Sequence, residues 1–209
     1  TIVVSLPINQ KKTEYNNASK HIDWLKKNYQ NIKTTTIDLS EVFEKYQNTI
    51  PKNYQSDLGF ANSKARIRMT TLYQIASKQN GIVVGTGNKI EDFGIGFFTK
   101  YGDGGVDISP IADLTKSEVI TLSVSCKITP EIIAAKPTDG LWGDGRTDED
   151  QIGATYKELE WAMNHTNNKK LSIKEQKVLN IYKSLNNQNK HKMLPIPICR
   201  IPKHLMFNS

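Results

Sequence analysis

The chain has 209 residues, of which 37% are hydrophobic and 8% aromatic, and this length and composition suit one globular domain and favour a folded chain over a disordered one. No run of about 18 apolar residues is present that could span a membrane, and the first segment, TIVVSLPINQKK, lacks the order of a signal peptide, so we expect a soluble, cytoplasmic protein. The net charge of +7 leaves three interpretations open: general compositional bias, an anionic small ligand, or nucleic acid, for which no recognition motif is present.

Short apolar segments alternate with helical patterns along the first 85 residues. Residues 1–8, TIVVSLPI, predict a buried strand, and residues 16–29 carry apolar side chains at helical spacing. The segment 34–39, TTTIDL, predicts a second strand, residues 59–80 a second helix, and residues 81–85, GIVVG, a third strand. Apolar strands joined by helices pair in parallel through right-handed crossovers. The predicted fold class is therefore α/β, with a parallel sheet that has helices on both faces.

Two capping-box pairs mark helix starts in the second half of the chain. Thr115 and Glu118 precede the apolar run VITLSVSC, and Ser172 and Glu175 precede QKVLNIYKSL. The Asn-rich stretch 186–192 is expected to be the place where this last helix frays into the tail.

The two cysteines, Cys126 and Cys199, form no CxxC pair and indicate neither a disulfide framework nor a zinc site. We expect both to be reduced, and we expect Cys126 to be buried on an apolar helix face.

The stretch 85–110, GTGNKIEDFGIGFFTKYGDGGVDISP, contains seven glycines and follows the third predicted strand. Ligands of open parallel sheets bind beyond the carboxyl ends of the strands, which makes this stretch a candidate site. Glu91, Asp103 and Asp107 offer the oxygen ligands that Mg²⁺ prefers when it bridges phosphates, and Lys100 offers a positive charge for the phosphates. The alternative is a glycine-rich loop whose charges are merely solvated.

Four segments resemble, in order and spacing, the ammonia-dependent NAD synthetases of the N-type ATP pyrophosphatase superfamily. The resemblance covers residues 62–192, and residues 1–61 more loosely. The segments are NSKARIRMTTLYQIA, then GTGNKIEDFGIGFFTKYGDGGVDISPIADLTKSEV, then KPTDGLWGDGRTDEDQIGATYKELE, and the late KHK.

The resemblance implies a Rossmann-like fold of the adenine nucleotide alpha hydrolase type and a two-step amidation. ATP and Mg²⁺ would activate the nicotinate carboxylate of deamido-NAD as an adenylate, and ammonia would then displace AMP to leave NAD. A homodimer is also implied. Amidation of nicotinate mononucleotide and a catalytically silent nucleotide-binding paralogue remain the alternatives.

The resemblance also assigns roles to particular positions, while no residue is assigned acid–base catalysis. Glu91 corresponds to the Mg²⁺ ligand. The positions that correspond to ATP contacts are Thr86, Lys116 and Thr138. Those that correspond to deamido-NAD contacts are Arg66, Lys100, Asp107, His191 and Lys192. Each has a structural alternative: a surface ion pair for Arg66, a solvated side chain for Lys116, and a turn at Thr138.

One motif of the family, a Ser-Gly-Gly-x-Asp-Ser loop that binds pyrophosphate after the first strand, does not occur in these residues. We therefore expect 1–209 to be a single NAD synthetase domain that is incomplete at its N-terminus. A preceding portion with glutaminase activity would replace free ammonia as the nitrogen source. The segment 139–151, DGLWGDGRTDEDQ, is expected to be an irregular lid over the adenylate, with the acidic residues 148–150 in a structural role.

Overall fold

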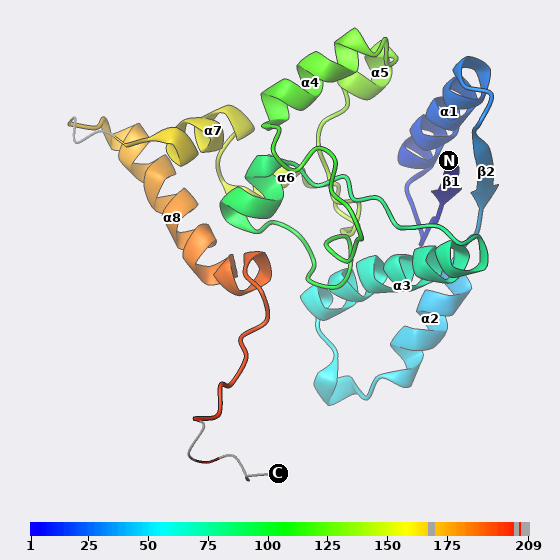
Figure 1. Cartoon of the computed structure of the whole chain (residues 1–209), viewed down its shortest axis with the longest axis horizontal. Coiled ribbons are helices and arrows are strands. Elements are labelled where there is room, and N and C mark those ends of the chain that lie inside the picture. Colours follow the sequence, from blue (N-terminus) through cyan, green and yellow to red (C-terminus); the bar gives the residue numbers. More distant parts are fainter. Residues whose placement is uncertain (167–169, 203–204, 206–209) are drawn as a thin grey trace.

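The computed structural model describes residues 1–166, 170–202 and 205. Its regular elements follow one another along the chain as Figure 1 shows. They are β1 (Ile2–Ser5), α1 (Lys12–Asn28), β2 (Lys33–Thr36), α2 (Ser40–Thr49), the 3₁₀ helix η1 (Lys52–Tyr54), α3 (Asp57–Lys78), the π-helix η2 (Lys89–Ile95), α4 (Lys116–Ser125), α5 (Pro130–Ile133), α6 (Asp148–Ile152), α7 (Tyr156–Asn164) and α8 (Ile173–Met193).

The first half of the chain is a parallel β–α–β unit covered by two further helices. β1 pairs in parallel with β2, with Ile2 opposite Lys33 and Ser5 opposite Thr36, and α1 makes the crossover. Ile8, Leu39 and Phe43 form a buried core that joins the strand ends to α2 and α3. The first two predicted strands are confirmed as β1 and β2, although both are shorter than predicted and no residue of β1 is buried. The predicted helices 16–29 and 59–80 are confirmed as α1 and α3, and the α/β class is confirmed, whereas α2 was not predicted.

The third predicted strand is shorter than expected. Within 81–85 only Val84 pairs, as an isolated parallel bridge with Ile108, supported by the 2.7 Å hydrogen bond from Gly85 N to Ile108 O. Ile82 and Val84 remain 58% and 53% exposed, because among the described residues no second strand lies along this segment. A strand needs a neighbour along its length to persist, and here the neighbour extends over only two residues.

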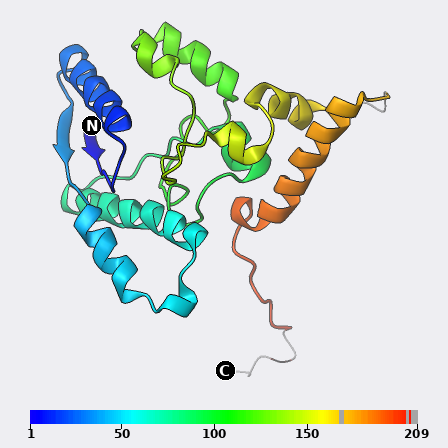
Figure 2. The ribbon, with the colours of Figure 1, turned by 180° about the vertical axis from the view of Figure 1, so that it is seen from behind.

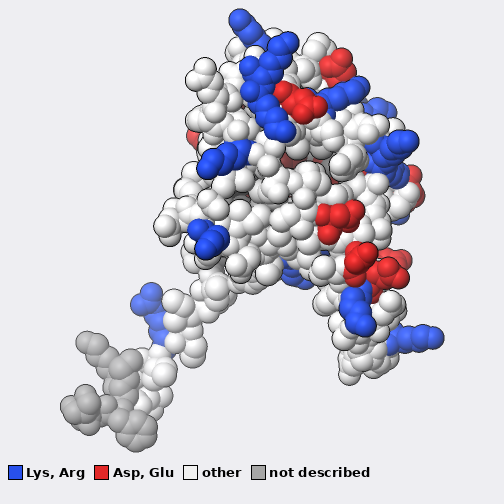
Figure 3. Space-filling view, turned by 90° about the vertical axis from the view of Figure 1, so that its right-hand side faces the viewer, with Lys and Arg blue, Asp and Glu red and all other residues white. Residues whose placement is uncertain are grey.

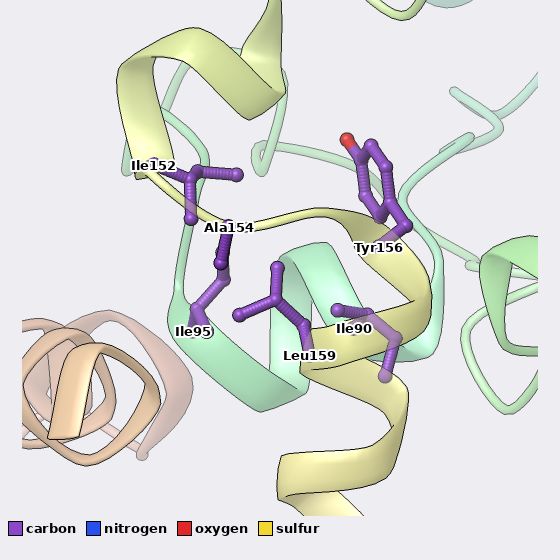
Figure 4. Packing of buried hydrophobic residues seen from close by; sticks show 6 residues of the cluster. All are labelled: Ile90, Ile95, Ile152, Ala154, Tyr156 and Leu159. Carbon is purple, nitrogen blue, oxygen red and sulfur yellow. The ribbon is translucent and has the colours of Figure 1, made fainter. Parts of the chain in front are cut away.

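A second core lies at the other end of the molecule from β1 and β2, as both views of the ribbon show (Figures 1 and 2). It is built from η2, the α6–α7 connection and α8. Figure 4 shows its six buried side chains, and the Tyr156 hydroxyl points away from the other five. They are Ile90, Ile95, Ile152, Ala154, Tyr156 and Leu159.

The Asn-rich stretch 186–192 does not fray, contrary to the prediction, because α8 continues to Met193. The side chains of Asn186 and Asn189 donate to the carbonyl oxygens of Gly94 and Ile95 at 2.7 and 2.9 Å. These bonds hold the last turns of α8 against η2 and offset the weak helix propensity of asparagine.

The prediction for Cys126 is also wrong, since both cysteines are free and exposed. Cys126 is the C-cap that follows α4, and the apolar residues Ile120, Leu122 and Val124 of that helix are themselves exposed. An apolar run predicts burial only where another element covers it.

Basic and acidic side chains are mixed on one face of the molecule. Figure 3 shows the face that carries α1 and β2, where lysine and arginine side chains gather in the upper part and acidic side chains lie among them and below. None of the helices in the described residues is long and apolar enough to cross a membrane.

Candidate functional site

Three helices in the second half of the chain begin in the same way. Each has a threonine N-cap whose hydroxyl accepts from the third residue of the helix, and each has an acidic side chain that bonds back to the cap, so all three are complete capping boxes. The threonines are Thr115, Thr147 and Thr155. A capping box determines where a helix begins, and here it determines the orientation of the first helical residue of α4, α6 and α7.

Those three first residues are Lys116, Asp148 and Tyr156, and they converge on Glu91 of η2. Glu91 Oε1 accepts from Lys116 Nζ at 3.0 Å and from the Tyr156 hydroxyl at 2.6 Å. The same hydroxyl lies 3.1 Å from Asp148 Oδ2, and Lys116 Nζ lies 4.8 Å from the centroid of the Tyr156 ring. We call Glu91, Lys116, Asp148 and Tyr156 the carboxylate centre.

The centre is largely shielded from solvent. The side chains of Glu91 and Lys116 are 16% and 22% exposed, and Asp148 is 7% exposed. Asp148 Oδ1 is buried and has no hydrogen-bond partner among the described residues, and burial raises the pKa of this carboxyl group. Burial, followed by the nearby charge of Glu91, raises the pKa of Tyr156, so the phenol keeps its proton.

Asp92 follows Glu91 and is partly buried beside it. Burial, then the carboxylates of Glu91 and Asp103, raises the pKa of Asp92 to about 7. Several carboxylates close together in a poorly solvated region repel one another, so the binding of a positively charged group stabilises them. This region therefore suits a cation or a cationic group better than an additional anion.

A second group of predicted residues surrounds the loop after η2. Arg66 Nε donates to Lys100 O at 3.3 Å, and Lys100 Nζ donates to His191 O at 2.7 Å. Lys192 Nζ donates to the carbonyl oxygens of Gly96 and Phe98 at 2.9 and 2.8 Å. We call Arg66, Lys100, His191 and Lys192 the basic cluster. It connects α3 and the end of α8 through one loop.

A cavity of about 510 Å³ lies between α3, the segment 83–86 and the loop 97–106. Thr86 and Lys192 line it, as do Asp139, Leu141 and Trp142 from the long connection before α6. The cavity wall at Gly85 and Thr86 continues directly into η2, which carries Glu91. The carboxylate centre and the cavity therefore share one short segment of chain.

The structure brings some of the predicted residues together and separates others. Glu91 and Lys116 meet in the carboxylate centre, and four of the deamido-NAD positions meet in the basic cluster. Asp107 instead accepts from Val83 N at 2.7 Å and from Tyr73 Oη at 3.1 Å, which fastens the 83–108 bridge. Thr138 is exposed, and its hydroxyl donates to Arg146 O at 3.2 Å, which closes the base of a loop.

The predicted irregular segment 139–151 is shorter than expected, because α6 begins at Asp148. Residues 148–150 cap a helix as expected, but Asp148 also belongs to the carboxylate centre. The pair Thr147 and Asp150 has capping-box spacing and could have shown that Asp148 opens a helix. The pair Thr155 and Glu158 likewise marks Tyr156 as the first residue of α7, but no local signal indicates its contact with Glu91, which spans 65 residues.

The carboxylate centre offers carboxylate oxygens, which are the protein ligands that Mg²⁺ takes. No group of three or more His, Cys, Asp or Glu side chains suited to a metal is found within residues 1–166, 170–202 and 205. Mg²⁺ usually takes only one or two protein carboxylates and completes its shell with water and phosphate oxygens. Glu91 Oε2 accepts no hydrogen bond from any described residue, and Asp148 Oδ1 is a buried acceptor without a partner among the described residues. The residues present therefore fit a magnesium ion that a nucleotide brings with it.

The chain is similar in sequence to known NAD synthetases. The NAD synthase family model matches residues 1–195. The chain is 44% identical over 139 residues to the NH(3)-dependent NAD(+) synthetase of Methanosarcina acetivorans, an alignment that covers 66% of this chain and 52% of that protein. It is 42% identical over 137 residues to the synthetase of the same name from Carboxydothermus hydrogenoformans, which covers 64% and 55%. The chain thus spans about half the length of these curated relatives.

Solved structures agree on the fold. The NMN synthetase from Francisella tularensis superposes with a TM-score of 0.82 at 31% identity, over 97% of this chain and 79% of that one. The NH3-dependent NAD synthetase from Campylobacter jejuni superposes with a TM-score of 0.67 at 21% identity, over 95% and 78%. The second likeness is one of fold alone, and both agree with a Rossmann-like α/β architecture.

Proposed function

Because the chain belongs to the NAD synthase family, we propose that the protein containing it amidates deamido-NAD to NAD, with ammonia as the nitrogen donor and ATP as co-substrate. The observation that supports this most strongly is the contact between Glu91 and Lys116, which are 25 residues apart and stand in two of the family's motif positions. A homodimeric, cytoplasmic enzyme is part of the same proposal.

In the first step, a carboxylate oxygen of the nicotinate ring attacks the α-phosphorus of ATP, and the bond to pyrophosphate breaks. The carboxylate needs this activation because its own oxygen is a poor leaving group. When bound, Mg²⁺ neutralises charge on the ATP phosphates. Glu91 provides the protein ligand for that ion, and Lys116, which Glu91 and the Tyr156 ring hold in place, presents a fixed positive charge to the phosphates. Thr86 and Thr138 are the proposed further ATP contacts.

In the second step, ammonia attacks the acyl carbon, AMP leaves, and the nitrogen loses a proton. The residues of the basic cluster, together with Asp107, are the proposed contacts of the dinucleotide. Lys192 supports this assignment, because it is held by two backbone carbonyls and also lines the cavity. Burial lowers the pKa of Lys192 against the opposing effect of Asp103, as expected for a lysine that leaves solvent to meet an anionic ligand.

A second candidate is amidation of nicotinate mononucleotide. Its support is the likeness to the Francisella tularensis protein named NMN synthetase, at a TM-score of 0.82 and 31% identity. We prefer deamido-NAD because the curated relatives with the higher sequence identities carry the NAD synthetase name.

The test is a product assay on the whole protein with ATP, Mg²⁺ and ammonium chloride. Either deamido-NAD or nicotinate mononucleotide is added, and the amide is identified by liquid chromatography with mass spectrometry. We expect NAD and AMP in equal amounts and a higher kcat/KM for deamido-NAD. A higher kcat/KM for nicotinate mononucleotide would select the second candidate, and no amide from either acid would select a silent nucleotide-binding protein.

A further inference from the structure

The carboxylate centre contains two residues to which the family resemblance assigned no role. Tyr156 and Asp148 come from different helices, and the hydroxyl group of Tyr156 contacts a carboxylate oxygen of Asp148. The same hydroxyl group donates the shortest hydrogen bond that Glu91 accepts. Figure 4 shows the Tyr156 ring set in the second core with its oxygen directed out of it. The ring is anchored by packing, so the position of the hydroxyl is defined.

We propose that Tyr156, braced by Asp148, is a positioning residue that holds the Glu91 carboxylate so that one of its oxygens faces the nucleotide-bound cation. This inference rests on the proposed function and deepens it.

The two carboxylate oxygens of Glu91 differ in their hydrogen bonds. Oε1 accepts from both Lys116 and Tyr156, whereas Oε2 accepts from no described residue. A carboxylate that is bonded through one oxygen cannot rotate freely, so the second oxygen keeps a constant direction. Mutation of a group that orients a metal ligand in this way typically lowers metal affinity by about 10- to 100-fold.

Asp148 contributes through its burial and its spare acceptor. Its Oδ2 lies 3.1 Å from the Tyr156 hydroxyl, while Oδ1 is buried without a partner among the described residues. A buried acceptor without a partner is unfavourable, and a water molecule bound to the cation would satisfy it. The burial of Asp148 is therefore better explained by a role in cation binding than by a contribution to folding.

Two tyrosines of the same core allow a matched comparison. Tyr156→Phe removes the hydroxyl but keeps the ring that packs in the core and faces Lys116. Tyr182→Phe removes a hydroxyl from a tyrosine that packs against the same core and makes no described contact with Glu91. Asp148→Asn changes the brace without a change of shape, and it serves as a second variant if Tyr156→Phe does not fold.

The main readout is binding of Mn²⁺ in the presence of a non-hydrolysable ATP analogue, measured by electron paramagnetic resonance on the whole protein. Thermal unfolding and the Mg²⁺ concentration for half-maximal amidation are measured alongside. We expect Tyr156→Phe to weaken Mn²⁺ binding by about 10- to 100-fold and to raise the Mg²⁺ requirement similarly. Asp148→Asn should act in the same direction, and Tyr182→Phe should match the wild type.

Wild-type Mn²⁺ binding by a folded Tyr156→Phe or, if that variant does not fold, by Asp148→Asn would overturn the inference. Equal weakening in Tyr182→Phe would also overturn it, because the effect would then belong to core packing. If the wild type formed no amide while Tyr156→Phe still weakened Mn²⁺ binding, the proposed function would fail and the positioning role would stand.

Discussion

The backbone of the loop 99–105 lies in close contact with α3, and this contact depends on the glycine at position 102. The loop 99–105 passes so near α3 that a β-carbon added to Gly102 would lie 2.9 Å from Ala65 Cβ and 2.8 Å from Thr99 Cγ2. Ala65 and Gly102 both line the cavity. The absence of a side chain at Gly102 therefore allows the loop to form the cavity wall.

We predict that Gly102→Ala destabilises the protein by about 1–3 kcal/mol, because the new methyl group would push the loop away from α3. Urea unfolding of the whole protein measures the change. Gly143→Ala is the matched control, since a β-carbon at Gly143 would meet nothing within 4 Å. Equal stability of the two variants would show that this contact is not tight in solution.

The sequence predicts candidate site residues more readily than it predicts the residues that contact them in the folded chain. Glu91 and Lys116 stood out because both lie in motifs that resemble a known family. Tyr156 and Asp148 did not, because a tyrosine and an aspartate at helix starts are common and their importance depends on contacts far along the chain. Cys126 was wrongly expected in the core, because an apolar run does not reveal whether another element covers it.

Secondary-structure elements meet here both along their sides and at their ends. Ala162 of α7 packs against Val178 and Leu179 of α8, and an ion pair of 2.7 Å between Glu158 and Lys174 links the first turns of the two helices. Glu158 also completes the capping box of Thr155. The hydrogen bond from Lys174, followed by that from Thr155, lowers the pKa of Glu158 to about 2 from its ordinary value of 4.5. This pair supports the position of α7, whose first residue is Tyr156.

A group whose pKa is lowered by folding stabilises the folded state above its unfolded pKa and loses that contribution as the pH falls towards the folded value. We therefore predict that Glu158→Gln lowers the free energy of unfolding at pH 7 by about 0.2–1 kcal/mol, a range that allows for solvent screening of an exposed pair. The difference from wild type should shrink as the pH falls from 4.5 towards 2.

Urea unfolding at several pH values measures this difference, and Lys174→Met is the companion variant. It removes the same ion pair and leaves the cap intact, so its effect at pH 7 should be similar to that of Glu158→Gln. A constant difference between Glu158→Gln and wild type over the whole pH range would contradict an electrostatic cause.

Elements with strong local signals were predicted well. The capping pairs Thr115–Glu118 and Ser172–Glu175 mark the true starts of α4 and α8. The end of α8 was wrong, because asparagine is a weak helix former and the bonds from Asn186 and Asn189 to η2 are tertiary contacts that no local pattern contains.

The whole molecule combines an α/β half and a helical half, and residues of both line the cavity of about 510 Å³. The alternation of strands and helices predicted the first half, whereas contacts between distant residues assemble the second. The segment 81–85 joins the two halves and pairs only through Val84 and Ile108. The parallel pairing predicted for this segment is therefore present, but the strand is shorter than predicted. Strand formation depends on a neighbouring strand, whose presence a local sequence pattern does not reveal.

Glu91 is the residue that we propose holds the cation during the reaction of ATP with deamido-NAD. Exchange of labelled pyrophosphate into ATP, measured without ammonia, isolates this first step in the whole protein. We predict that exchange requires both deamido-NAD and Mg²⁺, and that Glu91→Gln, which keeps the acceptor for Lys116 and Tyr156, reduces it by about 10- to 100-fold or more without a loss of folding. Glu44→Gln, an exposed change of the same chemistry on α2, should leave exchange unchanged. A rate in Glu91→Gln close to that of the wild type would contradict the claim.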